Sequence, residues 1–247
     1  MTDSSPFNTA ADLRDRGFSL RTPPVNIVAF DPAGDGDDND ALILLSREEH
    51  QRGETHDPDF AVEFVFRVLM AHQMQQGLEY PDKLAHLLHM HKRLNKWEKD
   101  GRERAHVFAI ENNGVGYAYA SDLRNRVSAS VVPYTTIGSG MGATDPTSKV
   151  TMPRLKGLSN LRVLMETHYL KIEPHAPGRD DLIAQFNSMV WRRKGRPEAM
   201  QGAHDDLVMA LTGGAWVGSM VVPPYLRHKA FAPRARQSHT SSRMRIQ

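Results

Sequence analysis

Acidic residues at the ends of apolar segments constrain the fold of this chain more than any other feature. Each segment is apolar enough to predict burial: Asp31 follows 27–30, Glu111 follows 106–110, and the pair Asp205–Asp206 precedes 207–211. A carboxylate at the end of a buried strand is held rigidly and still reaches solvent. Carboxylates brought together repel one another unless a divalent cation lies between them. We therefore expect a fold that gathers these groups around metal ions.

Composition limits the class of protein. The length of 247 residues fits one large domain, or one domain with tails. No apolar run approaches the roughly 20 residues that span a bilayer, and the N-terminus lacks a secretory pattern, so we expect no membrane contact and no secretion. The chain has no cysteine, which excludes disulfides, thiolate zinc sites and cysteine nucleophiles.

Charge is distributed unevenly, although the net charge is only +2. No acidic residue follows Asp206, whereas six basic residues do: Arg227, Lys229, Arg234, Arg236, Arg243 and Arg245. A basic tail beside an acidic centre suits a protein that acts on a polyanion. The alternative is a disordered end that only aids solubility.

Hydrophobic periodicity predicts one α/β domain at 25–219, preceded by a linker or arm at 1–24 and followed by a basic, flexible tail at 220–247. Strands are expected at 25–30, 41–46, 61–70, 105–111, 127–137 and 169–172. Helices are expected at 81–97, 114–126, 153–166, 180–191 and 203–217. The first two strands would form a hairpin, and later strands alternate with helices. This order favours a central mixed β-sheet with helices on both faces.

Each acidic motif also has a purely structural interpretation. Asp31 followed by Pro-Ala-Gly could cap a turn, and Asn112 or Asn113 after Glu111 could cap the next helix. Asp205 could do the same for the last helix. Asp206 aligns with apolar positions one turn later, so we expect it to lean toward the packed side and rank it above Asp205 as a direct metal ligand.

Other polar motifs carry less weight. Asp37, in a turn dense in Gly and Asp, and His204 are candidates for a second metal or its outer coordination sphere. The histidines His86, His89 and His91 share no single helix face well and are expected to be solvated. The chain contains neither a P-loop nor a G-x-S-x-G serine hydrolase motif.

Taken together, the motifs make the sequence similar to a known family, the C-terminal nuclease domain of the large terminase subunit of tailed phages. The matching segments are Phe30-Asp31-Pro32-Ala33-Gly34, Ile110-Glu111-Asn112-Asn113-Gly114-Val115-Gly116 and Gly202-Ala203-His204-Asp205-Asp206-Leu207-Val208-Met209-Ala210-Leu211. Lys149 and Arg154 before a helix, with the strand 169–172 after it, also resemble the family's layout. The resemblance spans roughly 25–217 and is most specific in its last segment.

The resemblance implies a ribonuclease H-like fold and metal-dependent cutting of concatemeric double-stranded viral DNA during packaging. Carried over by position, Asp31, Glu111 and Asp206 would bind metal, with Asp205 adjacent. Two Mg²⁺ or Mn²⁺ ions would serve a two-metal hydrolysis, to which carboxylate ligands are suited. We expect DNA phosphates to be contacted, without reading of the bases, by five basic residues: Lys149, Arg154, Arg192, Arg193 and Lys194.

The resemblance also implies partners and a location. These are double-stranded DNA, the terminase ATPase domain, the portal and the small terminase subunit, in the cytoplasm of an infected bacterial host. Because the chain lacks a Walker A motif, we expect an isolated or separately encoded nuclease domain that is a monomer by itself. Alternatives are a Holliday-junction resolvase, an integrase-like enzyme of the same fold, or a non-catalytic DNA-binding or portal-docking module.

Overall fold

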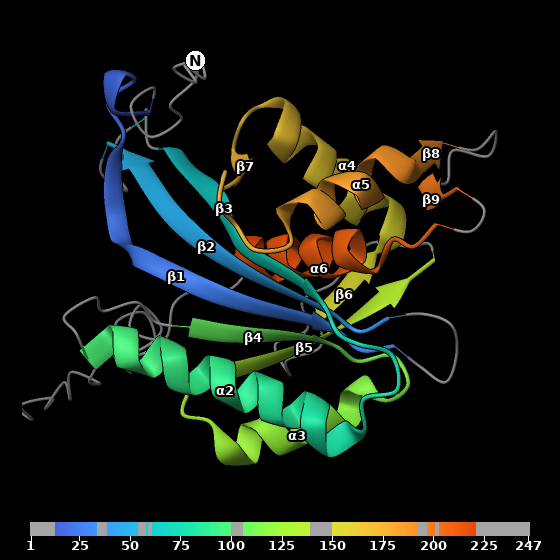
Figure 1. Ribbon diagram of the computed structural model, residues 1–247. Coiled ribbons are helices and arrows are strands. Elements are labelled where there is room, and N and C mark those ends of the chain that lie inside the picture. Colours follow the sequence, from blue (N-terminus) through green and yellow to red (C-terminus); the bar gives the residue numbers. More distant parts are fainter. Residues whose placement is uncertain are drawn as a thin grey trace, which may run out of the picture.

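The fold is built on a seven-stranded mixed sheet (Figure 1). The computed structural model describes residues 13–33, 39–53, 58, 61–99, 106–138, 150–191, 197–200 and 203–220. The strands are β1 (Ser19–Asp31), β2 (Ala41–Arg52), β3 (Ala61–Gln73), β4 (His106–Glu111), β5 (Ser130–Ile137), β6 (Val150–Pro153) and β7 (Leu170–Ile172). Their order across the sheet is β6-β5-β4-β1-β2-β3-β7.

Strand direction determines which ends of the strands meet. β2 is antiparallel to β1 and β3, whereas β4 is parallel to β1, and β5 and β6 continue in that direction. The carboxyl ends of β1, β3, β4, β5 and β6 therefore lie at one edge of the sheet. The polar residues that end β1, β3 and β4, namely Asp31, Gln73 and Glu111, are thereby brought to a common edge.

Helices cover both faces of the sheet (Figure 1). They are α2 (Tyr80–Lys99), α3 (Gly116–Arg126), α4 (Arg154–Glu166), α5 (Arg179–Ser188) and α6 (Asp206–Met220). α2 and α3 pack on one face with Val28, Phe30 and Phe108, while α4, α5 and α6 pack on the other with Ile27 and Ala29. The predicted architecture, a central mixed β-sheet with helices on both faces, is confirmed.

The α6 helix forms the centre of the second core. From Leu207 to Ala215 each of its residues is buried, as its nearly uniform apolar sequence predicts. Among the helices that the structure describes, none combines the length and apolar character that crossing a bilayer requires.

Several predicted elements differ from the structure. β1 begins at Ser19, inside the segment 1–24 that was expected to be a linker, because its first part pairs with the far end of β2. The predicted helix 180–191 ends at Ser188, because Met189–Trp191 forms strand β8 and pairs with β9 (Pro197–Ala199). β6 was not predicted. The division of the chain at its two ends stays a prediction, since 1–12 and 221–247 lie outside the described residues.

The prediction for His91 was wrong. Its side chain is buried, and its Nδ1 lies 2.7 Å from Nε2 of His106 on β4. His86 and His89 are exposed, as expected. The α2 sequence alone does not reveal this pairing, because the partner histidine comes from another element.

Candidate active site

The pleat of the sheet aims the two strand-end carboxylates at the same face. Phe30 pairs with Ile110 across β1 and β4, so Asp31 and Glu111 come next to each other. Side chains alternate along a strand, and Ala29 and Ala109 belong to the core that contains α6. Asp31 and Glu111, two residues further along, therefore project toward α6.

The start of α6 completes the carboxylate cluster. Asp206 is its first residue, with Asp205 immediately before it. Gln185 of α5 accepts a hydrogen bond of 2.8 Å at Oε1 from the backbone N–H of Leu207, which fixes the first turn of α6. This turn would otherwise have an unpaired buried donor. The anchored turn holds both aspartates over the sheet edge.

All four predicted carboxylates line one cavity of about 420 Å³. Its other lining residues are Pro32, Ala33, Asn39, Asn113, Gly114, Thr136, Arg154 and Met209. Three helices start at this cavity, because Gly114 precedes α3, Arg154 opens α4 and Asp206 opens α6. Helix N-termini carry partial positive charge and unpaired N–H groups. The cavity thus combines fixed carboxylates with donors suited to an anion.

Burial and neighbouring carboxylates destabilise the charged form of Asp31. The pKa of Asp31 is raised well above its ordinary value, chiefly by burial, then by its hydrogen bond with Glu111 and by the charges of Glu111, Asp206 and Asp205. A cation between these groups would reverse the effect, since an opposite charge favours the ionised form. The site therefore has the electrostatics of a cation-binding centre.

The turn after Glu111 is shaped by two glycines, Gly114 and Gly116. Gly114 has a positive φ of 58°. A Cβ on Gly116 would lie 1.7 Å from the carbonyl oxygen of Glu111 and 3.2 Å from Pro32 Cγ. Only a glycine lets α3 start this close to the strand end. Neither asparagine caps α3: the N-cap is Val115, without a side-chain hydrogen bond. Asn113 instead donates to Glu111 Oε1 at 2.8 Å.

The two aspartates of α6 have different partners. Asp205 pairs with the guanidinium of Arg154. Asp206 accepts hydrogen bonds at Oδ2 from the backbone N–H of Asn39 at 3.3 Å and from Gln73 Nε2 at 3.4 Å. His204 is exposed, with Nδ1 3.7 Å from the same oxygen. Asp206 has the less exposed side chain, 12% against 20% for Asp205, so it does lean toward the packed side. Its rank as a metal ligand stays a prediction.

The donor chemistry fits hard divalent cations, although the side chains are not arranged as a closed coordination sphere. Carboxylate oxygens are the ligands that Mg²⁺ and Mn²⁺ prefer. Within the described part of the chain, no three His, Asp or Glu side chains have their donor atoms placed around a single point. The Arg154–Asp205 pair explains part of this, because it directs one carboxylate to a guanidinium. Metal binding would require Asp205 or its neighbours to reorient.

Several predicted site residues lie outside the described residues. These are Asp37, Lys149, Arg192, Arg193 and Lys194. Their roles stay predictions. Arg154, the remaining predicted DNA-binding residue, does line the cavity.

Two residues near the carboxylates were missed from the sequence. Tyr134 of β5 pairs with Glu111 across the sheet and is buried, and burial together with the charges of Asp31 and Glu111 raises its pKa well above the ordinary value. Gln73 ends β3 at the same sheet edge. A polar residue at the end of an alternating strand could have indicated Gln73, but the predicted strand ended at residue 70. Tyr134 had no local signal.

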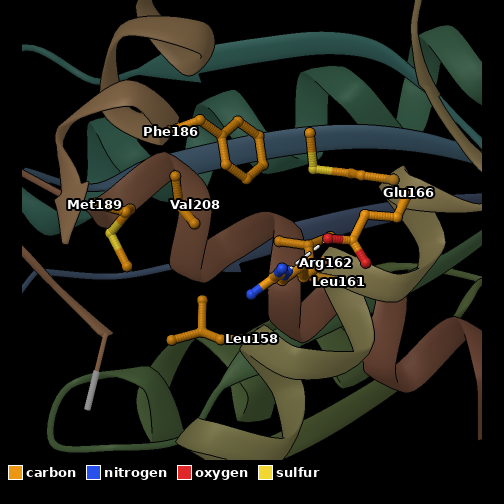
Figure 2. A pocket seen from close by; sticks show the side chains of 8 residues that line it. Leu158, Leu161, Arg162, Glu166, Phe186, Met189 and Val208 are labelled. Atoms are coloured by element: carbon orange, nitrogen blue, oxygen red, sulfur yellow. Dashed lines mark hydrogen bonds and ion pairs between the residues drawn. The ribbon is translucent and has the colours of Figure 1, made fainter. Parts of the chain in front are cut away.

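A second cavity, of about 290 Å³, lies between α4, α5 and α6 (Figure 2). It is lined by Leu158, Leu161, Arg162, Met165, Glu166, Phe186, Met189 and Val208. Its polar groups are Arg162 and Glu166, which pair with each other at 2.7 Å. Among its described lining residues Glu166 is the single carboxylate, so it holds no carboxylate cluster.

Comparisons with known proteins give a likeness in structure. No protein-family model matches the sequence, and no curated protein is significantly similar to it. The Mn-soaked, inhibitor-bound nuclease domain of human cytomegalovirus terminase has 9% identity and a TM-score of 0.46, over 79% of this chain and 84% of that chain. Another structure of that domain has 10% identity and a TM-score of 0.46, over 82% and 86%.

Proposed function

We propose that this protein is a metal-dependent endonuclease that hydrolyses phosphodiester bonds of double-stranded viral DNA during genome packaging. The observation that carries the proposal is the meeting of Asp31, Glu111, Asp205 and Asp206 at one cavity beside Arg154. Mutually repelling carboxylates have no evident packing role there. Their arrangement suits cation binding next to a phosphate.

Under this proposal, Asp31, Glu111 and Asp206 hold two Mg²⁺ or Mn²⁺ ions, with Asp205 adjacent. When bound, such ions supply an activated water and a counter-charge for the leaving oxygen. Asn113 orients Glu111 through its hydrogen bond. Gln73 and the Asn39 N–H orient Asp206 in the same way. These contacts fix carboxylates that would otherwise turn away from one another.

Arg154 has two roles in the proposal. Without metal it neutralises Asp205. Once cations take over that task, its guanidinium is released to bind a phosphate of the substrate. The start of α4, which has no side-chain cap, adds the positive end of a helix as a further phosphate-binding group. Contacts of this kind read no base edges, so cutting would show little sequence preference.

The biological setting belongs to the proposal as well. The enzyme would work in the cytoplasm of an infected bacterial host, together with a terminase ATPase domain, a portal and a small terminase subunit. DNA concatemers would be its substrate. Mass measurement in solution tests the expected monomer.

A panel of DNA substrates tests the activity and separates the alternatives. Wild-type protein and Glu111→Gln are each incubated with three substrates in Mg²⁺, Mn²⁺ or EDTA. The substrates are a linear duplex, a four-way junction, and duplex ends together with an acceptor plasmid. We expect metal-dependent duplex cutting that Glu111→Gln abolishes. Preference for the junction would favour a resolvase, and joining of ends an integrase-like enzyme. Metal-independent binding without cutting would leave a silent DNA-binding module.

A further inference from the structure

Exposed apolar residues lie close in sequence to residues that line the carboxylate cavity. Val115 and Tyr117, at the start of α3, are 40% and 68% exposed, and Leu155, next to Arg154 at the start of α4, is 43% exposed. Each lies within three residues of one that lines the cavity. Solvated apolar groups gathered around a site mark a surface that another molecule covers.

Folding does not require an aromatic ring at position 117. The buried side of α3 consists of Gly116, Tyr119, Ala120 and Leu123. Tyr117 lies outside this buried side and is exposed, so a polar residue would serve there equally well. Within the described residues, its ring has no aromatic neighbour and its hydroxyl no hydrogen bond.

The position of Tyr117 relative to the active site is fixed by its neighbour. Gly116 is wedged between the carbonyl of Glu111 and the ring of Pro32, with no room for a Cβ. Glu111 and Pro32 both line the cavity. The helix backbone that carries Tyr117 is therefore fixed next to two residues that line the cavity.

Basic side chains accompany the apolar ones on both helices. Arg124 lies seven residues after Tyr117, so it shares the exposed face of α3 about 10 Å further along the axis, roughly three base steps of a DNA strand. Lys156 follows Leu155 on α4 and is exposed. Neither basic group forms an ion pair with another described residue. Positive charge beside apolar groups matches a nucleic acid better than an apolar protein surface.

We propose that α3 and α4 form a two-sided rim that seats double-stranded DNA over the cavity. Tyr117 and Val115 contact sugars and bases next to the cut phosphate, Leu155 does so from the other side, and Arg124 and Lys156 bind flanking phosphates. The inference rests on the proposed function, since it assumes a DNA substrate. It assigns substrate positioning to residues outside the carboxylate cluster.

Binding of a fluorescein-labelled 30-base-pair duplex, measured by anisotropy in EDTA at several salt concentrations, tests the rim. We expect Tyr117→Ala to weaken binding about fivefold or more, as for the loss of an aromatic anchor at an interface, and Tyr117→Phe to bind like wild type. Arg124→Gln should lower the salt slope by about one. Val163→Ala, a change at an exposed apolar residue in a later turn of α4, is the matched control.

The outcomes separate this inference from the proposed function. If the wild-type protein binds no duplex even at low salt, the proposed function fails and the rim with it. If the wild type binds, but Tyr117→Ala and Arg124→Gln both stay within twofold of it, the rim alone is wrong and the apolar residues serve another partner. If the variants have the same thermal unfolding temperature as the wild type, a loss of DNA affinity reflects a lost contact with DNA and not a damaged fold.

Discussion

Asp31 and Glu111 end adjacent parallel strands, and their carboxyl groups contact each other through a hydrogen bond. Two carboxyls in contact need either a shared proton or a cation between them. Without metal, the site therefore destabilises the fold that carries it. Changes that remove this repulsion should therefore stabilise the metal-free protein.

Removing the charge of Asp31 should stabilise the metal-free protein. We expect Asp31→Asn to raise the Tm in EDTA by on the order of 3 °C, because a buried and repelled carboxylate is replaced by a neutral amide. Asp180→Asn, a change at an exposed carboxylate that pairs with Arg179, is the control and should not raise it. A lower Tm for Asp31→Asn in EDTA would show that the carboxylate is structural.

The pH dependence of stability follows from the raised pKa of Asp31. The folded protein retains a proton that the unfolded chain releases near the ordinary value of 3.8. The contribution of protonated Asp31 to the free energy of unfolding is thus fully present below pH 3.8 and is lost as the pH rises through the pKa of Asp31 in the folded protein. Urea unfolding in EDTA should show this loss in the wild type and a flatter profile in Asp31→Asn. Identical pH profiles of stability for the two proteins would contradict the raised pKa of Asp31.

Metal binding should reverse the effect at neutral pH. Mn²⁺ at a hundredfold excess over its Kd should stabilise the wild type by about 2.7 kcal/mol. Asp206→Asn should reduce Mn²⁺ affinity more than Asp205→Asn, since Asp206 has the less exposed side chain and Asp205 is held by Arg154. Calorimetric titration measures both variants. A larger loss for Asp205→Asn would reverse the ranking.

The packing beneath the site can be tested independently of metal. A Cβ on Gly213 of α6 would lie 2.1 Å from the ring of Tyr134. We expect Gly213→Ala to destabilise the fold by about 3 kcal/mol, because neither ring nor helix can easily move aside. Gly138→Ala meets no atom within 4 Å and is the matched control. Equal urea midpoints for the two variants would contradict the tight packing.

The carboxylate cluster was predictable because it depends on local patterns. Runs of apolar residues indicate the strands, and the end of each run places Asp31 and Glu111 where parallel strands finish. The all-apolar sequence after Asp206 likewise indicates a buried helix that begins at the carboxylates.

The features that were missed depend on long-range register. Tyr134 lies beside Glu111 because β5 pairs with β4 at one particular offset and because Gly213, far along the chain, leaves space for the ring. His91 is buried because His106 of β4 meets it. The predicted helix 180–191 stops at Ser188 because the next residues form β8, which pairs with β9. No local periodicity encodes these relationships.

Cleavage of supercoiled plasmid by wild-type protein and by Asp31→Ala, in Mg²⁺, Mn²⁺ and EDTA, shows whether the carboxylate cavity is a nuclease centre. We expect nicking and linearisation by the wild type in either metal, none in EDTA, and none by Asp31→Ala despite retained folding and duplex binding. Equal cleavage by Asp31→Ala, or cleavage that persists in EDTA, would contradict the assignment of this cavity as a metal-dependent nuclease centre.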